Sequence, residues 1–260
     1  MRIALIGHGW IASKMSHALR GKHQVVQILS HANCFDYLRS PAPVDWVVNC
    51  AGVTGTPNVD ACETQKAKTI DGNTLFPIKL MQDCIARGVR LAHFSSGCIF
   101  SGGPFSEDDP PNFDGSVYSA TKLVSDVALL KHALVLRIRM PFDGSDHPKN
   151  LLTKLRRYAA TGKVLDGYNS VTHADEACAA AAKLIAEGAP NGPYHLVNDG
   201  GIWTHEIMHK LGLAPQFWDK AEFAKTFPAP RSECVLVSRT PLSEIHECLE
   251  RTILQMKVAA

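Results

Sequence analysis

A tyrosine and a lysine lie four residues apart in the stretch Tyr118-Ser119-Ala120-Thr121-Lys122. The apolar residues after it predict a helix, and residues i and i+4 share one helical face. An ammonium beside a phenol favours the phenolate, so we expect a pKa below the usual value for Tyr118. Such a group exchanges protons near neutral pH. Ser96, which follows a predicted strand over 89–94, can bond the same substrate oxygen. The three side chains predict hydride transfer at a carbonyl.

A glycine-rich turn lies near the start of the chain. Residues 2–6 predict a buried strand, Gly7-His8-Gly9-Trp10-Ile11-Ala12 follows, and a helix is expected to about residue 19. In the pattern G-x-G-x-x-A, Gly7 allows the tight turn and Gly9 lets the backbone approach a pyrophosphate. With Trp10 and Ile11 at the helix start, the pattern predicts a dinucleotide site. Its alternative is an ordinary turn with two glycines.

The second predicted strand, 25–29, ends at Ser30-His31. An NAD site usually carries Asp or Glu at this point, and none appears before Asp36. Ser30 followed by His31, with Lys14 on the first helix, is better suited to a 2′-phosphate. The sequence therefore favours NADP(H) over NAD(H).

Strands alternate with helices through residue 141, which predicts an α/β fold with a Rossmann-type, doubly wound parallel sheet. The third strand, 44–48, leads to Asn49-Cys50-Ala51-Gly52, and we expect Asn49, Ala51 and Gly52 to lie beneath the cofactor. Helices are expected at 73–86, 151–158 and 174–186, and strands at 134–139 and 194–197. We predict an NADP-binding domain of residues 1–141 that also receives about 171–198. A smaller C-terminal substrate lobe would comprise 142–170 and 199–260.

The composition limits the functional classes. A chain of 260 residues with 45% hydrophobic residues can bury a full core. Its net charge of +2 argues against a nucleic-acid or membrane-surface protein, and no apolar run approaches the length of a membrane span. The first residues lack the pattern of a signal peptide. The eight cysteines are scattered without a CxxC pair, which favours reduced thiols in a cytoplasmic protein.

With these residues in view, the chain resembles the extended short-chain dehydrogenase/reductases, since the glycine-rich turn, Asn-x-Ala-Gly, Ser96 and Tyr-x-x-x-Lys match in order and spacing. Within that family it resembles dTDP-4-dehydrorhamnose reductases and, more closely, the nucleotide-rhamnose synthase/epimerase-reductases of plants and large viruses. The stretches that carry this closer resemblance are 7–11, 51–60, 96–100, 111–113, 137–141, 150–154 and 229–232.

The resemblance implies C3 and C5 epimerisation of a nucleotide-linked 4-keto-6-deoxyhexose, then reduction of its C4 ketone with NADPH. Ser96 and Tyr118 would hold the C4 oxygen, and Lys122 would bind the nicotinamide ribose. Asn73 matches the family's helix Asn and would support a water-linked proton path; a helix cap is its alternative. Pro141 would lie beside the cofactor, and Thr54, Arg139, Asn150 and Arg231 would contact the substrate. We expect the guanidinium groups to bind its diphosphate.

The resemblance also implies that Cys98 and Lys154 are the acid and base of epimerisation. Cys98 lies two residues beyond Ser96, so both side chains face one side if the backbone is extended. A thiol acts as a base more readily when an ammonium such as that of Lys154 stabilises its thiolate. The alternative is a buried apolar cysteine and a solvated lysine.

One motif points elsewhere. The stretch His205-Glu206-Ile207-Met208-His209 spells H-E-x-x-H, a zinc-protease signature. No third ligand follows at the expected spacing, and the resemblance places an ordinary helix start here. We therefore predict no metal site.

We predict a bifunctional 3,5-epimerase/4-reductase that makes a nucleotide-linked L-rhamnose, with UDP as the favoured nucleotide. A separate 4,6-dehydratase would supply its substrate, and relatives suggest a homodimer. The alternatives are a dTDP-4-dehydrorhamnose reductase without epimerase activity and a non-catalytic, cofactor-binding regulatory relative.

Overall fold

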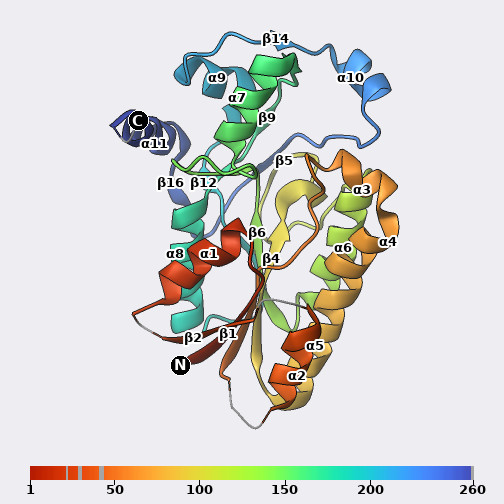
Figure 1. Ribbon diagram of the computed structural model, residues 1–260, viewed down its shortest axis with the longest axis vertical. Helices are drawn as coiled ribbons and strands as arrows, with labels where there is room; N and C mark the ends of the chain where they lie inside the picture. Colours follow the sequence, from red (N-terminus) through yellow and green to blue (C-terminus); the bar gives the residue numbers. More distant parts are fainter. Residues whose placement is uncertain (22, 29–30, 41–43, 259–260) are drawn as a thin grey trace.

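A six-stranded parallel sheet forms the centre of the computed structural model, which describes residues 1–21, 23–28, 31–40 and 44–258 (Figure 1). The strand order is β11-β6-β4-β3-β1-β2, and every neighbouring pair is parallel. The strands are β1 (Arg2–Ile6), β2 (Gln24–Ile28), β3 (Trp46–Asn49), β4 (Arg90–Ser96), β6 (Ala133–Ile138) and β11 (Gly192–His195). This arrangement confirms the predicted doubly wound sheet.

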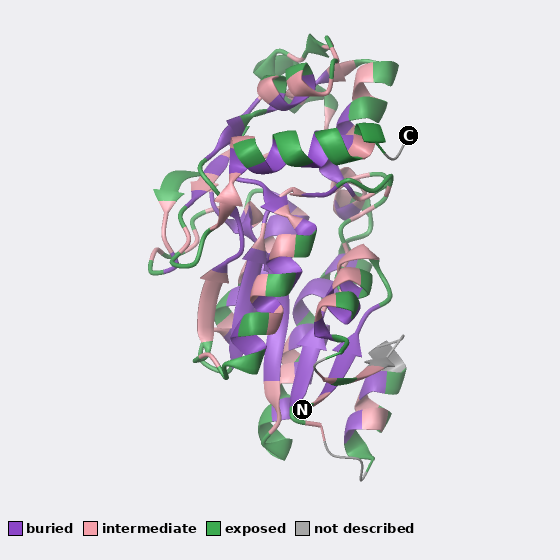
Figure 2. Ribbon diagram, turned by 90° about the vertical axis from the view of Figure 1, so that its left-hand side faces the viewer, coloured by how far each residue is buried: buried purple, intermediate pink, exposed green. Residues whose placement is uncertain are grey.

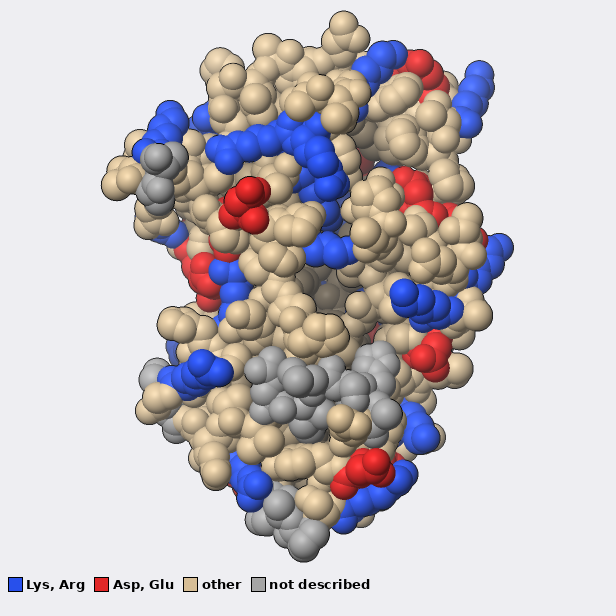
Figure 3. Space-filling model, viewed as in Figure 1, with Lys and Arg blue, Asp and Glu red and all other residues tan. Residues whose placement is uncertain are grey.

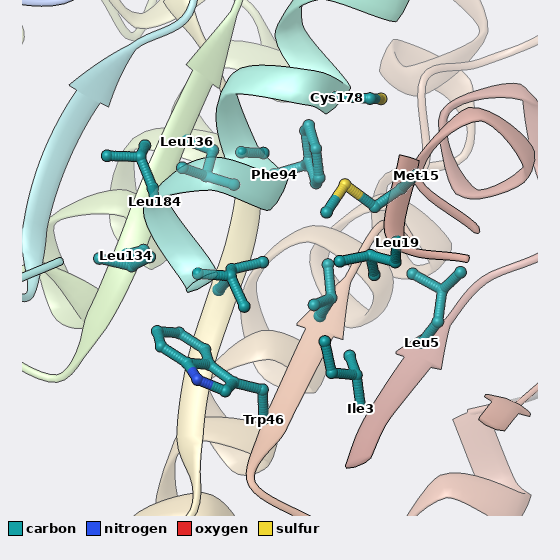
Figure 4. Packing of buried hydrophobic residues seen from close by; sticks show 14 of the residues in the cluster. Ile3, Leu5, Met15, Leu19, Trp46, Phe94, Leu134, Leu136, Cys178 and Leu184 are labelled. Atoms are coloured by element: carbon teal, nitrogen blue, oxygen red, sulfur yellow. The ribbon is translucent and has the colours of Figure 1, made fainter. Parts of the chain in front are cut away.

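Helices cover both faces of the sheet (Figure 1). They are α1 (Trp10–Leu19) and α8 (Ala174–Ala186) on one face, and α2 (His31–Arg39), α5 (Phe76–Arg87) and α6 (Val117–Leu129) on the other. Figure 4 shows Met15 and Leu19 of α1 and Leu184 of α8 packed over Ile3, Trp46 and Leu134. Since both faces are covered, the strands are apolar on both sides and read as continuous apolar runs.

The C-terminal elements pack around a separate apolar cluster beyond the end of the sheet (Figures 1 and 2). The helices that contribute to it are α7 (Leu151–Thr161), α9 (Thr204–Lys210) and α11 (Ile245–Val258). Helix α10 (Lys220–Thr226) has no buried residue and lies outside this cluster. Two-stranded pairs join this region: β7 (Pro141–Phe142) with β10 (Thr172–His173), β8 (Lys163–Val164) with β14 (Gln216–Phe217), β9 (Tyr168–Asn169) with β13 (Ile202–Trp203), β12 (Asn198–Asp199) with β16 (Leu242–Glu244), and β15 (Cys234–Leu236) with β5 (Gly102–Phe105). The proposed division into two domains stays a prediction.

Short helical turns connect the sheet to the site. They are α3 (Asp60–Thr64), α4 (Lys66–Ile70), the π-helical turn η1 (Asp71–Leu75) and the 3₁₀ turn η2 (Gly97–Ile99). The helix predicted at 73–86 is therefore preceded by η1, and Asn73 lies inside the helical run instead of capping it. None of the helices in the described part of the chain has the length and apolarity that crossing a membrane requires.

The carboxyl ends of the parallel strands gather the residues that the sequence analysis selected. Gly7 follows β1, Asn49 ends β3, Ser96 ends β4 and Arg139 follows β6. Ligands of doubly wound sheets bind at this edge, which we call the carboxyl edge.

A buried ion pair fastens β6 to α6 near this edge. Arg137 Nη2 donates to Asp126 Oδ1 at 2.6 Å, and Arg137 Nε donates to Asp126 Oδ2 at 3.1 Å. Ser95 Oγ donates to the same carboxylate at 2.6 Å, and both charged side chains are almost fully buried. The pair satisfies two charges that could not be buried alone.

We therefore expect Asp126→Ala to lower the free energy of unfolding by about 3–5 kcal/mol, because it leaves the Arg137 guanidinium buried without its carboxylate. Urea titration followed by circular dichroism measures this change. Glu187→Ala is the matched control, since Glu187 lies 3.9 Å from Lys183 in an exposed pair and should barely move the midpoint. Equal effects of the two variants would contradict the structural role of the buried pair.

Candidate active site

Tyr118 and Lys122 lie on the first turns of α6. This helix begins after Ser116, whose Oγ accepts a hydrogen bond from Ser119 N at 3.1 Å and caps the helix. Both side chains are buried, Lys122 with 4% and Tyr118 with 9% relative exposure. Lys122 Nζ donates to the carbonyl oxygen of Phe94 in β4 at 3.3 Å. The helix therefore carries an ammonium into the interior, against the central strand.

Burial dominates the electrostatics of this pair. It raises the pKa of the Tyr118 phenol above its usual value, and negative charge on Cys98 raises it further, while a hydrogen bond with Ser96 lowers it. Burial lowers the pKa of Lys122 to about 8, against the influence of Asp126. The prediction that Lys122 lowers the Tyr118 pKa was wrong, because desolvation outweighs the neighbouring positive charges. Tyr118 is thus held as a neutral phenol, which can donate a proton.

Ser96 and Cys98 lie where β4 ends in the 3₁₀ turn η2. Ser96 Oγ accepts a hydrogen bond from Cys98 N at 3.1 Å and so caps that turn. The extended backbone expected between the two residues is absent. Cys98 is partly exposed, its Sγ accepts from Arg139 Nη1 at 3.5 Å, and it interacts electrostatically with Tyr118, Lys122 and Lys154. A side chain at Gly97 would lie 2.7 Å from Leu236 Cδ1 and 3.3 Å from Arg139 Cβ, so the tight turn requires glycine.

Arg139 is buried, in contrast to the expected diphosphate ligand. Its Nη1 donates to the Gly97 carbonyl at 3.3 Å and to Cys98 Sγ at 3.5 Å. Its Nη2 donates to the Ser232 carbonyl at 2.7 Å and to the Asn169 side chain. With 2% exposure and its terminal nitrogens bonded within the protein, this guanidinium does not fit the role of a diphosphate ligand.

Asn73 joins η1 to the turn after β3. Its Oδ1 accepts from Val53 N at 2.8 Å, and its Nδ2 donates to Val53 O at 2.9 Å. Asn49 Oδ1 accepts from Ala51 N at 3.0 Å within the same turn. A side chain at Gly52 would lie 3.2 Å from Lys122 Nζ. These bonds fix the backbone of the turn directly beside the buried ammonium.

The glycine-rich turn has the geometry that a dinucleotide diphosphate requires. Gly7 adopts φ +113°, and a Cβ there would meet the Ala51 nitrogen at 3.2 Å. Apart from its chain neighbours, no atom of the described residues lies within 4 Å of a Cβ built at Gly9, and none of their side chains caps the start of α1. The backbone N–H groups at Trp10 and Ile11 therefore begin the helix beside open space, where an anion is favoured.

The surroundings of Lys14 differ from those expected of a residue that binds the 2′-phosphate of NADP. Lys14 pairs with Asp143 and, at 2.8 Å, with Asp175, so two carboxylates already hold its ammonium. Trp10 stacks on His147, with ring centroids 5.2 Å apart. Ser30 lies outside the described residues, while Pro141 begins β7. The cofactor contacts assigned to both stay predictions.

Lys154 lies on α7 and is tuned by its surroundings. Burial lowers the pKa of its ammonium to about 8, the positive charges of Lys149 and Arg157 lower this pKa as well, and Cys98 raises it.

Lys149, which the sequence analysis missed, donates through Nζ to Thr54 Oγ1 at 2.9 Å. Its position, eleven residues after β6 ends at Ile138, gave no pattern that could have indicated this contact. In the view of Figure 3, which has the same orientation as Figure 1, Lys and Arg side chains gather above a hollow near the middle of the molecular surface.

Two other predicted substrate contacts have protein partners. Asn150 is fully buried, caps α7 through Oδ1, and donates through Nδ2 to the Ser145 carbonyl at 2.6 Å. Its hydrogen-bonding capacity is used within the protein, so a direct substrate contact does not fit. Arg231 donates to Asp60 Oδ2 at 2.6 Å and remains partly exposed. Its role toward a diphosphate stays a prediction, as does that of Thr54.

The H-E-x-x-H stretch forms the start of α9. Glu206 Oε2 accepts from the Trp203 backbone N–H at 2.8 Å, and His205 Nδ1 lies 2.8 Å from Asp166 Oδ2. Among the described residues, the one group of side chains compact enough to hold a metal is instead His173, Glu176 and Cys248. Its Glu176 carboxylate already bonds Arg251 and Ser243.

A family model described as the RmlD substrate binding domain matches residues 1–237. The chain belongs to this family. In Arabidopsis thaliana, a bifunctional dTDP-4-dehydrorhamnose 3,5-epimerase/dTDP-4-dehydrorhamnose reductase is 39% identical in an alignment 204 residues long, which covers 72% of this chain and 66% of that protein. A trifunctional UDP-glucose 4,6-dehydratase/UDP-4-keto-6-deoxy-D-glucose 3,5-epimerase/UDP-4-keto-L-rhamnose-reductase from the same plant is 37% identical over 72% of this chain. The RmlD-family chain spans only 30% of that longer relative.

Solved structures share the RmlD-type fold. The L780 UDP-rhamnose synthase of Acanthamoeba polyphaga mimivirus superimposes with a TM-score of 0.87 at 24% identity, covering 98% of this chain and 99% of that one. A dTDP-4-dehydrorhamnose reductase from Bacillus anthracis in complex with NADP gives a TM-score of 0.82 at 16% identity, covering 98% and 99%. At these identities the likeness shows the fold.

The low pKa of Lys122 predicts a pH-dependent cost in stability. The unfolded chain keeps this amine protonated up to about pH 10.5, while the folded chain releases the proton near pH 8. Unfolding therefore takes up a proton between these pH values, and this group's contribution to stability rises with pH across that window. We expect Lys122→Met to be more stable than the parent chain at pH 7, by roughly 2 kcal/mol, with the gain lost by about pH 11.

Urea unfolding of both proteins from pH 6 to pH 11 measures this difference. Lys183→Met, at an exposed position of α8, is the matched control and should show no such trend. A parent chain that is more stable than Lys122→Met at pH 7 would contradict the desolvation of this ammonium.

Proposed function

We propose that the chain is an NADPH-dependent 3,5-epimerase/4-reductase that acts on a nucleotide-linked 4-keto-6-deoxyglucose and yields nucleotide-L-rhamnose. The observation that carries the proposal is the placement of Ser96 and Cys98 at the end of β4, where Cys98 N donates to Ser96 Oγ at 3.1 Å and Cys98 interacts electrostatically with Tyr118 and Lys154. A proton donor for the ketone oxygen and an acid–base pair for the ring carbons therefore surround one space at the carboxyl edge.

Reduction requires a proton at O4 when C4 accepts a hydride. Tyr118, kept protonated by burial, donates that proton, and Ser96 bonds the same oxygen and orients it. Lys122 lies four residues after Tyr118 on α6 and brings a buried positive charge to the same part of the helix. This charge stabilises the phenolate that is left after transfer.

Epimerisation uses the same oxygen site. A ketone acidifies its neighbouring C–H bonds only if the enolate oxygen is stabilised, and Tyr118 with Ser96 provides hydrogen bonds for it. The C–H electron pair moves into the enolate as a base removes the proton, and an acid then protonates the carbon from the opposite face. In the 4-keto-6-deoxy-D-glucose ring, H3 and H5 lie on one face. One base and one acid, Cys98 and Lys154, therefore serve both centres after exchange with solvent.

The cofactor assignment rests on the fit at the glycine-rich turn and on related structures. Gly7, Gly9 and the uncapped start of α1 would hold the diphosphate, and the turn at Asn49, Ala51 and Gly52 would lie beneath the nicotinamide half. When bound, NADPH supplies the hydride. The dTDP-4-dehydrorhamnose reductase from Bacillus anthracis is in complex with NADP, and the reduction for which it is named is of the kind proposed for this chain. The structurally similar MoeE5 is in complex with NAD and UDP-glucose, so NAD(H) is the second, less favoured candidate.

UDP is the proposed nucleotide, supported by the names of the trifunctional Arabidopsis relative and of the mimivirus synthase. The bifunctional Arabidopsis relative, named for dTDP sugars, supports the second candidate. The 4,6-dehydratase step would take place in a separate catalytic unit.

NADPH oxidation with UDP- and dTDP-4-keto-6-deoxyglucose, assayed side by side, tests the proposal. We expect consumption of NADPH with a rhamnose-configured product and a preference for UDP. Turnover confined to a pre-epimerised keto sugar would instead support the reductase without epimerase activity. No turnover of any 4-keto-6-deoxy sugar, despite NADPH binding, would favour the regulatory relative.

Substitution of Cys98 should separate the two reactions. We expect Cys98→Ala to reduce turnover of the unepimerised substrate by about 10²–10⁴-fold, the usual contribution of a general acid or base. Reduction of a pre-epimerised substrate should stay within a few-fold. Tyr118→Phe is the comparison variant, since both substrates should then lose turnover. Equal losses with both substrates in Cys98→Ala would mean that the cysteine is structural.

A further inference from the structure

Arg139 is a buried cation without a carboxylate partner among the described residues. The ion pairs found there include Arg137 with Asp126 but none at Arg139. The partners of Arg139 are two backbone carbonyls, two neutral side chains and a thiol, and its Nε has no hydrogen-bond partner. Arginine does not lose its proton in proteins, so the full positive charge is held in the interior.

Burying such a charge is expensive unless a negative charge lies beside it. Of the hydrogen-bond partners that Arg139 has among the described residues, Cys98 alone can become an anion, and its Sγ lies 3.5 Å from Nη1. The guanidinium cannot turn away from that sulfur, because Nη1 also bonds the Gly97 carbonyl and Nη2 bonds the Ser232 carbonyl. The sulfur and the cation are therefore held together by three separate chain segments.

The matched case in the same structure supports this reading. Arg137, two residues earlier on β6, is equally buried and receives a full carboxylate from Asp126. Beside Arg139 the described residues place no such carboxylate, and the ionisable group in contact with the guanidinium is the Cys98 thiol, which is negatively charged only after it loses its proton. A cation that serves only packing would be expected to have a permanent counter-charge, as Arg137 has.

We propose that Arg139 is the fixed counter-cation of Cys98: it positions the sulfur and stabilises its thiolate. In this way it prepares Cys98 to remove a proton from the carbon beside the substrate ketone. The proton goes to sulfur, the C–H electron pair enters the enolate, and the thiol later returns its proton to solvent. Arg139 acts through Cys98 as a positioning residue, and the catalytic part of this inference rests on the proposed epimerase function.

Other ionisable groups also face Cys98 and must be separated from Arg139 in any test. They are Tyr118 and Lys122 on α6, Lys154 on α7 and Cys234 on β15. Lys122 and Lys154 are cations that their own burial discourages, with pKa values of about 8. Arg139 alone keeps its charge at every pH of interest.

The rate of Cys98 alkylation by iodoacetamide, followed by peptide mass spectrometry from pH 5 to pH 10, tests the proposal without any substrate. Only the thiolate reacts, so an ordinary thiol shows about 3% of its plateau rate at pH 7. For Cys98 we expect a fraction of the plateau rate at pH 7 that is at least five times larger. Arg139→Gln should reduce the pH 7 rate at least five-fold while leaving the plateau unchanged, and Arg139→Lys should restore part of it.

Lys154→Met removes the other nearby cation and should lower the pH 7 rate by a smaller factor than Arg139→Gln does. A parent-chain profile of an ordinary thiol would overturn the inference, even if Arg139→Gln did not fold. A larger loss of the pH 7 rate in Lys154→Met than in Arg139→Gln would overturn it as well, since the lysine would then be the main counter-cation. A reactive Cys98 in a chain that fails to epimerise would refute the proposed function and leave the thiolate assignment standing.

Discussion

Positive charge buried at the carboxyl edge of the sheet is the constraint on which the site depends. Lys122 and Arg139 are almost fully buried, and neither forms an ion pair with a carboxylate among the residues that the structure describes. Charges in such surroundings are poorly solvated and interact strongly with any anion that forms nearby. A site of this kind stabilises an enolate or an alkoxide in the making, because the cations are in place before the charge develops.

Contacts within the scaffold hold the elements that surround these cations. The Arg137–Asp126 pair fastens β6 to α6, and Asn73 fastens η1 to the turn after β3. These contacts lie directly beside the unpaired cations. Arg137, which joins two elements of the scaffold, is thus paired with a carboxylate, whereas Lys122 and Arg139, which lie at the site, have no carboxylate partner among the described residues. Stability given up at Lys122 is the expected cost of a preformed active site.

Much of the fold could be predicted because it follows from local patterns. Apolar runs gave the strands, the spacing of glycines gave the turn between β1 and α1, and Tyr118 with Lys122 marked the helix that we propose to be catalytic. The residues that were misjudged are those whose role depends on partners far away in sequence. Arg139 pairs with Ser232 and Asn169, Lys14 with Asp143 and Asp175, and Lys149 with Thr54. Spacing carries no information about such contacts, nor about the burial that decides the Tyr118 pKa.

The central claim is that one oxygen site, surrounded by buried cations, supports both enolate formation and reduction. Its most direct test is NMR of UDP-4-keto-6-deoxyglucose in D₂O with the protein and oxidised NADP⁺, which prevents reduction and isolates the first chemistry. The account predicts that deuterium from solvent replaces hydrogen at C3 and C5 without any change at C4. Retention of both hydrogens, under conditions where the protein binds the sugar and the nucleotide, would contradict it.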